Sequence, residues 1–134
     1  MGTRDLTLEV TAPAADRPRI ERLVRQTLQS EDRRLERIEV SFVDAAAIQK
    51  LNREHRGKDR PTDVLSWPFG DDFPQGSGGE VIVCPEQADR TQARILDRLV
   101  VHGVLHLLGY EDETDAGLAD MERRTDGIVE AVDE

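Results

Sequence analysis

The sequence predicts helices packed on one small mixed sheet of four strands. Two kinds of apolar spacing alternate along its 134 residues. Spacing of two is typical of half-buried strands, and spacing of three or four is typical of helices with one buried face. The predicted order is strand, helix, strand, helix, strand, strand, helix, helix. With no internal repeat or linker, we expect a single domain over residues 1–134, long enough to bury roughly two-thirds of the surface of the unfolded chain.

The first half of the chain holds two predicted strands and two predicted helices. Residues 5–10 (DLTLEV) alternate apolar and polar side chains and predict an edge or hairpin strand. A helix is expected over residues 18–28, with Asp16 as its N-cap. Residues 37–43 (RIEVSFV) return to period two, and residues 44–55 (DAAAIQKLNREH) predict the second helix.

The second half is predicted to supply two more strands and two more helices. Residues 62–69 (TDVLSWPF) predict a strand that ends near its proline, and residues 80–84 (EVIVC) predict a short buried strand. Residues 86–108 have the pattern of one long helix, which Gly109 would end. The tail from residue 113 predicts a last amphipathic helix with a strongly acidic outer face.

Charge is unevenly distributed along the chain. The net charge of −10 argues against a general nucleic-acid coat protein, because binding of that kind depends on neutralising phosphates. Residues 111–134 carry ten acids against two arginines, whereas residues 50–60 (KLNREHRGKDR) carry five bases against two acids. The basic segment can be an ordinary solvated helix end and loop, or a site for an anionic partner. In either case His55 is expected to face solvent.

Composition also predicts where the protein works. Cys84, the single cysteine, cannot form an internal disulfide. No apolar run approaches the ~20 residues of a membrane span. The first ten residues, MGTRDLTLEV, lack the pattern of a signal peptide. These observations predict a cytoplasmic protein with no membrane partner.

A histidine motif near the end of the long predicted helix suggests a metal site. His102 and His106 are four residues apart, so both imidazoles project from one face of the helix. Gly109 can adopt a left-handed conformation and reverse the chain, which would return Asp112 to the two histidines. The spacing H-x-x-x-H-x-x-G-x-x-D matches the metzincin pattern of zinc ligands. The alternative is a pair of ordinary helix histidines.

Two further alternatives concern the residues around this motif. Gly103 occupies the position of the metzincin glutamate, the general base of peptide hydrolysis, so a metalloprotease is disfavoured. Asp112 can instead serve as the cap of the acidic tail helix. Its neighbour Glu111 can equally be the third ligand. The sequence predicts a metal site and leaves its third ligand open.

Three long segments carry a resemblance to a known family. They are LNREHRGKDRPTDVLSWPF (residues 51–69), GGEVIVCPEQA (78–88) and VVHGVLHLLGYED (100–112). In these segments the sequence resembles the YbeY endoribonucleases, also described as rRNA maturation factors. The resemblance implies an α+β fold with zinc at the end of the long helix. It also implies a metal-dependent, single-strand-specific endoribonuclease that acts on rRNA in ribosome maturation and quality control, with components of the small ribosomal subunit as partners.

The resemblance assigns three metal ligands, and this sequence departs from the family pattern at the third ligand. His102 and His106 match the first two of three family histidines, whereas this sequence has Asp112 in place of the third. Glu111 and Glu80 each stand where the family usually has an aspartate. A carboxylate also binds zinc, so the site can be preserved. An oxygen ligand broadens tolerance toward harder divalent metals such as Mn²⁺.

The resemblance and the charge pattern together assign the RNA contacts. A family arginine falls on Arg56, which is expected to hold the phosphate and the charge that develops in the transition state. Arg53, Lys58 and Arg60 would follow the RNA backbone. Glu111, an activated water and the RNA 2′-hydroxyl remain alternatives for the general base.

Polar side chains in the third predicted strand have two interpretations. Val64 and Trp67 are expected to pack inside. Thr62, Asp63 and Ser66 can orient Arg56 or a ligand histidine.

Two rival functions remain open. One is a ribosome-associated binding protein with the same fold and weakened or lost nuclease activity. The other is a metal-dependent hydrolase of a substrate other than RNA.

Overall fold

The computed structural model describes residues 6–11, 16–70 and 77–133, and its elements follow the predicted order. A short 3₁₀ helix, Pro85–Gln87, follows the last strand. The strands and helices are β1 (Thr7–Thr11), α1 (Arg17–Ser30), β2 (Arg37–Phe42), α2 (Ala45–Arg56), β3 (Val64–Pro68), β4 (Gly78–Val83), α3 (Ile95–Leu107) and α4 (Asp115–Val132).

The four strands form one mixed sheet in the order β1-β2-β4-β3. Strands β1, β2 and β4 are parallel, and β3 runs antiparallel to β4. The fold is therefore α+β with a small mixed sheet, as predicted. β1 is an edge strand, but it does not form a hairpin, because a parallel partner requires a crossover and α1 supplies it. Asp16 caps α1 through its side chain, as expected.

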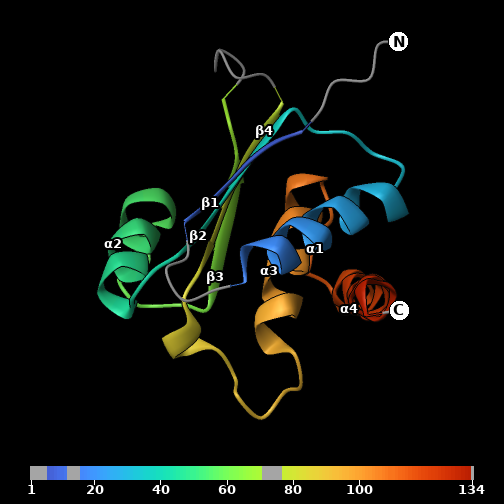
Figure 1. Ribbon diagram of the computed structural model, residues 1–134. Helices are drawn as coiled ribbons and strands as arrows, with labels where there is room; N and C mark the ends of the chain where they lie inside the picture. The colour runs from blue at the N-terminus through green and yellow to red at the C-terminus, as the bar shows by residue number, and fades with distance from the viewer. Residues whose placement is uncertain (1–5, 12–15, 71–76, 134) are drawn as a thin grey trace.

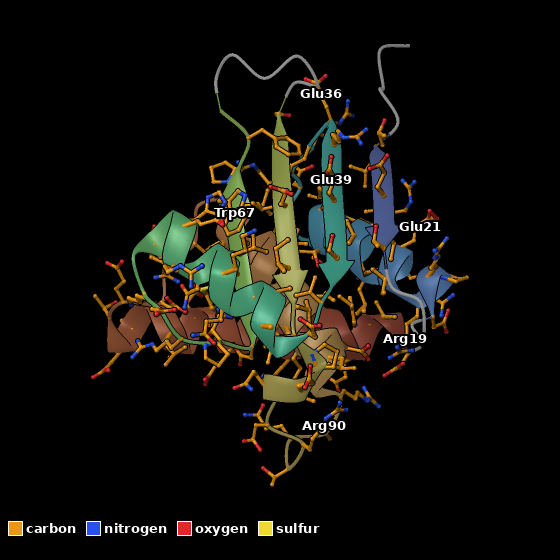
Figure 2. The ribbon with its side chains drawn as sticks, turned by 90° about the vertical axis from the view of Figure 1, so that its left-hand side faces the viewer. Arg19, Glu21, Glu36, Glu39, Trp67 and Arg90 are labelled. Carbon is orange, nitrogen blue, oxygen red and sulfur yellow. The ribbon has the colours of Figure 1, made fainter. Side chains whose placement is uncertain are left out.

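The sheet separates two hydrophobic cores. In Figure 1, α2 covers one face of the sheet, and α1, α3 and α4 cover the other. The larger core lies on the three-helix side and includes Ile38 and Val40 of β2, with Phe42 packed against it. Figure 2 views the sheet from the α2 side, where Trp67 of β3 packs against the smaller core. Within the described residues, no helix combines the length and apolar composition needed to cross a bilayer.

The long helix is shorter than the sequence pattern predicts. The prediction of one helix over residues 86–108 is wrong, because α3 begins at Ile95 and Arg94 before it has a left-handed φ of 57°. The Asp89 side chain accepts hydrogen bonds from the backbone and the hydroxyl of Thr91, at 3.0 and 2.6 Å. A turn of this kind offers the backbone an alternative to the helix. The last helix also begins slightly later than predicted, at Asp115.

Gly103 lets α3 pack closely against β4 of the sheet. A Cβ at this position would lie 2.5 Å from Cγ1 of Val81 on β4. Any side chain here would point into the core, so the fold excludes a metzincin-type glutamate at this position. We expect Gly103→Ala to lower the free energy of unfolding by about 1–3 kcal/mol through overpacking, measured by urea denaturation.

Gly127 in α4 is the matched control for this prediction. It also lies inside a helix, but a Cβ there would meet nothing within 4 Å. Gly127→Ala should stabilise the protein by about 0.5–1 kcal/mol, because alanine loses less backbone entropy in a helix than glycine does. If both substitutions changed the free energy of unfolding equally, close packing against Val81 would not be the reason for glycine at position 103.

Candidate metal centre

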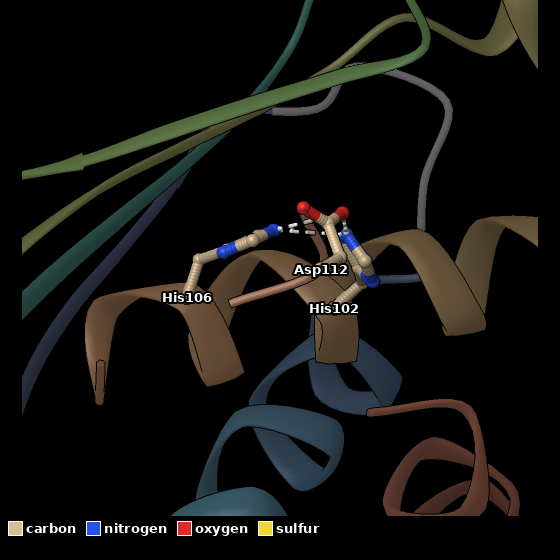
Figure 3. A group of neighbouring side chains, drawn as sticks. All are labelled: His102, His106 and Asp112. Atoms are coloured by element: carbon tan, nitrogen blue, oxygen red, sulfur yellow. Dashed lines mark hydrogen bonds and ion pairs between the residues drawn. The ribbon is translucent and has the colours of Figure 1, made fainter. Parts of the chain in front are cut away.

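Three side chains from α3 and the loop after it converge on one point (Figure 3). His102 and His106 lie one turn apart on α3, and their Nε2 atoms are 3.0 Å apart. An Oδ2 atom of Asp112 lies 3.2 Å from Nε2 of His102 and 3.4 Å from Nε2 of His106. Among the residues that the structure describes, this is the one group of His, Cys, Asp or Glu side chains close enough to hold a metal ion.

The loop between α3 and α4 returns Asp112 to the histidines. The backbone N–H of Gly109 donates to His106 O, and that of Tyr110 donates to Leu105 O, which closes the end of α3. Gly109 has a φ of 102°, a conformation that other residues rarely adopt. The glycine therefore makes the reversal that the sequence pattern predicts.

The structure distinguishes the alternatives for Asp112 and Glu111. Asp112 is not the cap of α4, because the Thr114 side chain accepts a hydrogen bond from the N–H of Gly117. The Asp112 carboxylate is free to face the histidines. Glu111 is exposed and does not belong to the converging group.

The backbone of Tyr110 sets the tautomer of His106. The carbonyl oxygen of Tyr110 lies 2.9 Å from Nδ1 of His106 and accepts a hydrogen bond from it. With the proton on Nδ1, Nε2 of His106 carries a free lone pair, which is directed toward His102 and Asp112. Histidine ligands of metals are commonly oriented in this way.

The geometry of the three side chains fits a tetrahedral metal. Zinc ligands at about 2.0–2.1 Å from the ion lie about 3.3–3.4 Å from one another. The three separations here are 3.0, 3.2 and 3.4 Å. The donor set is two imidazole nitrogens and one carboxylate, which suits zinc and also harder divalent ions. The residues present therefore fit a divalent cation held by three protein ligands.

The protonation states at neutral pH also suit metal binding. Burial lowers the pKa of His102, and the neighbouring His106 lowers it further. His102 is therefore neutral near pH 7, which is the form that binds metals. Burial alone would raise the pKa of Asp112, but the charges of His106 and His102 and the hydrogen bond with His106 bring its pKa below the ordinary value. The third side chain is thus an anion.

The convergence point opens on a groove of about 430 Å³ that also holds Arg56 and Glu111. Arg56 is the last residue of α2, and its side chain lines this groove. Thr62, Asp63 and Ser66, the polar residues singled out around the third strand, line it as well. β3 and the two residues before it therefore form part of the groove wall beside the histidines.

The basic segment is not brought together in this groove. Arg56 lines it, whereas Arg53, Lys58 and Arg60 are exposed and do not. Arg53 forms an ion pair with Asp59 at 3.2 Å. In the described part of the chain, the guanidinium of Arg56 has no hydrogen bond or ion pair, so it is available to an anion.

His55 is exposed, as expected, but it also has a partner that the sequence does not reveal. Its ring stacks on Trp67, with the centroids 4.1 Å apart and the planes at 17°. The indole N–H of Trp67 donates to Glu80 at 2.7 Å. Trp67 and Val64 are only partly buried, less than predicted.

A second cluster that sequence reasoning missed holds the loop of Asp112 in place. The Tyr110 hydroxyl donates to Glu31, just after α1, and this hydrogen bond together with burial raises the pKa of Tyr110. Arg124 of α4 donates to Glu31 at 2.9 Å and lies 4.6 Å from the centre of the Tyr110 ring. We call Glu31, Tyr110 and Arg124 the loop clamp. No local sequence signal pointed to it, because its members come from three distant segments.

Comparison with known proteins identifies the family. The family model described as Endoribonuclease YbeY matches residues 7–133. The chain belongs to the YbeY endoribonuclease family. This confirms the resemblance carried by the three sequence segments.

Individual relatives of the YbeY family support the same assignment. An Endoribonuclease YbeY of Moorella thermoacetica is 42% identical over 112 residues, which cover 71% of this chain and 72% of that protein. An Endoribonuclease YbeY of Alkaliphilus oremlandii is 36% identical over 107 residues, covering 71% of each chain. The solution structure of TM1509 from Thermotoga maritima matches with a TM-score of 0.59 and 27% identity, covering 94% of this chain and 89% of that one.

Proposed function

We propose that this protein is a metal-dependent endoribonuclease that cleaves single-stranded RNA in the cytoplasm during rRNA maturation and ribosome quality control. One observation carries the proposal within the YbeY family. His102, His106 and Asp112 converge to within 3.4 Å of one another on a groove that also holds Arg56, an arginine with no ion pair among the described residues. The proposed partners are rRNA and components of the small ribosomal subunit.

Different residues of the groove would have different roles in phosphodiester cleavage. A divalent cation on the three ligands, zinc in our proposal, would supply Lewis-acid activation of water and of a phosphate oxygen. Arg56 would hold the phosphate through its planar guanidinium, which can donate two parallel hydrogen bonds. Glu111 lines the same groove and would accept a proton from the attacking group. In our proposal the groove, with a volume of about 430 Å³, would admit a flexible strand and exclude a rigid duplex.

A cleavage assay with matched RNAs tests this function. Metal-loaded protein should cut a single-stranded RNA and leave the same sequence intact in a duplex. Metal-dependent binding of RNA without cutting would favour the rival ribosome-associated binding protein. The strongly acidic exposed residues of α4, including Glu122, Asp126 and Glu130, would suit basic partners in that case. Cutting of an ester other than RNA would favour the third function.

The aspartate ligand should raise the pH at which the enzyme becomes active. An anionic ligand makes the centre less positive than a third neutral imidazole would, and so disfavours the ionisation that activates the attacking water. Asp112→His removes this negative charge. We expect the rising limb of the pH–rate profile to move to lower pH by about one unit. An unchanged profile, with metal content equal to that of the parent, would contradict this role of Asp112.

The loop clamp should control metal affinity from outside the site. Glu31→Ala removes the acceptor that holds both Tyr110 and Arg124, and the Glu31 side chain is only 7% exposed. We expect metal affinity to fall about 10–100-fold, because the Tyr110 carbonyl that orients His106 loses its support. The free energy of unfolding should fall by about 1–3 kcal/mol. Competition with a chromophoric chelator measures the first effect, and urea denaturation measures the second.

Glu21→Ala, on the α1 helix that precedes Glu31, is the control for the loop clamp. Among the described residues, Glu21 forms one ion pair, an exposed one with Arg25 at 3.8 Å, which contributes little. This variant should keep the parent's metal affinity and stability. If Glu31→Ala destabilised the fold but left metal affinity unchanged, the loop clamp would have no part in positioning the ligands.

A further inference from the structure

A second hollow lies on the other side of the metal centre. It has a volume of about 300 Å³ and is lined by residues of α3 and α4 and of the segment before α3. Four residues line both this hollow and the groove that holds Arg56. These shared residues are Asp63, Val64, His102 and Asp112. The two hollows therefore meet at the metal centre, one on each side.

An endonuclease has to hold its strand on both sides of the bond that it cuts. This reasoning rests on the proposed function. The groove on the first side offers Arg56 to a phosphate. The hollow on the second side, which we call the α3–α4 hollow, is then positioned for the next part of the same strand.

Part of the lining of the α3–α4 hollow is apolar. Ile95 and Leu99 of α3 and Leu118 of α4 line it. Leu118 is 39% exposed and is the one exposed large hydrophobic side chain in the part of the chain that the structure describes. It lies on a helix whose other exposed residues are largely charged. Such an exposed apolar side chain beside a reaction centre is available for contact with a ligand.

The charges in the α3–α4 hollow argue against a phosphate there. Asp63, Asp112 and Glu122 are acidic, and the one arginine of the lining, Arg98, is paired with Asp126 at 2.5 Å. A phosphate would be repelled, whereas an uncharged aromatic base can pack on the apolar side chains. Carboxylates accept hydrogen bonds from exocyclic amino groups, as Glu and Asp do from cytosine.

We propose that the α3–α4 hollow binds the nucleobase next to the scissile phosphate, and that it prefers a base with an exocyclic amino group. Leu118 supplies the contact with the face of the base. Glu122 accepts from its amino group. Through this hollow the enzyme selects where along a flexible strand it cuts.

The test uses a short single-stranded RNA whose cut bond has been mapped with metal-loaded parent protein and is flanked by cytosines. An abasic nucleotide is placed in turn on each side of that bond, and kcat/KM is measured. On one side only, we expect kcat/KM to fall about 10-fold, the size of effect expected when the base loses its apolar contact with Leu118. Uracil at that position should also lower kcat/KM, and Glu122→Gln should reduce the difference between cytosine and uracil.

A double-mutant comparison links this base to Leu118. Leu118→Ala should lower kcat/KM on the intact RNA and have little further effect on the abasic RNA, because the two changes remove the same contact. Ala119→Ser, at the next exposed position of α4, is the control and should change neither value. The proposal is overturned if neither abasic substitution matters, or if Leu118→Ala acts equally on both RNAs.

Failure of the proposed function gives a different result. In that case no RNA is cut by the metal-loaded parent. Equilibrium binding of the same intact and abasic RNAs then tests the α3–α4 hollow directly. Equal affinities for the two RNAs would overturn the base site, and a loss of affinity that depends on Leu118 would support it.

Discussion

Replacing His102 with alanine abolishes both metal binding and RNA cleavage in the proposed mechanism. The substitution removes one of three ligands. It leaves Nε2 of His106 and Oδ2 of Asp112, which are 3.4 Å apart. Two ligands do not complete the three-ligand set that catalytic zinc sites use. We expect stoichiometric metal in the purified parent, none in the variant, and cleavage reduced to background.

Thermal unfolding gives a second readout for His102→Ala. A ligand that binds only the folded state stabilises it by about 2.7 kcal/mol at 100 times its dissociation constant. The midpoint of unfolding should therefore rise with added zinc in the parent but not in the variant. This measurement does not depend on any nuclease assay, so traces of contaminating nuclease cannot affect it.

His55→Ala is the matched control for His102→Ala. His55 is a histidine outside the metal centre, and its ring stacks on Trp67. This variant should keep its metal and its response to zinc, with at most a small loss of stability from the lost ring contact. Metal content that stayed the same in His102→Ala, or that fell equally in both variants, would refute the assignment of the centre.

Replacing Arg56 with alanine is expected to stop chemistry without removing the metal. Arg56 lines the groove beside the three ligands, and its guanidinium has no partner among the described residues. Loss of one donor to the charge that develops in the transition state typically lowers kcat by about 100–1,000-fold. Metal content and the midpoint of unfolding should match those of the parent, because the Arg56 side chain is exposed.

Two further variants distinguish the paired hydrogen-bond donors of Arg56 from its positive charge. Arg56→Lys keeps the charge but loses the planar pair of donors, so we expect only partial recovery of kcat. Arg53→Ala removes a positive charge one turn earlier on α2, at an arginine paired with Asp59 and outside the groove. It should weaken RNA binding slightly and leave kcat unchanged. Equal loss of kcat in Arg53→Ala and Arg56→Ala would indicate a general effect of charge.

The convergence of the metal centre could be predicted because its causes are local. The period of the helix places His102 and His106 on one face, and the positive φ of Gly109 turns the chain so that Asp112 returns to them. Both causes act within eleven residues of sequence. The same locality explains the correct element order and the capping of α1 by Asp16.

The errors arose where a local signal was ambiguous or a contact was distant. Apolar spacing extended the long helix back to residue 86, whereas the turn at Asp89 delays its start to Ile95. The charge pattern identified a basic segment but could not show that only Arg56 reaches the groove. That outcome depends on where α2 ends relative to β3, which is decided by packing of the helix on the sheet.

The sequence by itself determined the types and order of the elements, the family and the two converging histidines. Only the tertiary structure decided which groups surround them. The loop clamp joins Glu31 to Arg124, 93 residues apart, and the α3–α4 hollow forms where two helices separated by a loop leave Leu118 exposed. Helix and strand periods relate residues that are a few positions apart, so they cannot predict contacts between distant segments. Such contacts form only when the hydrophobic cores pack.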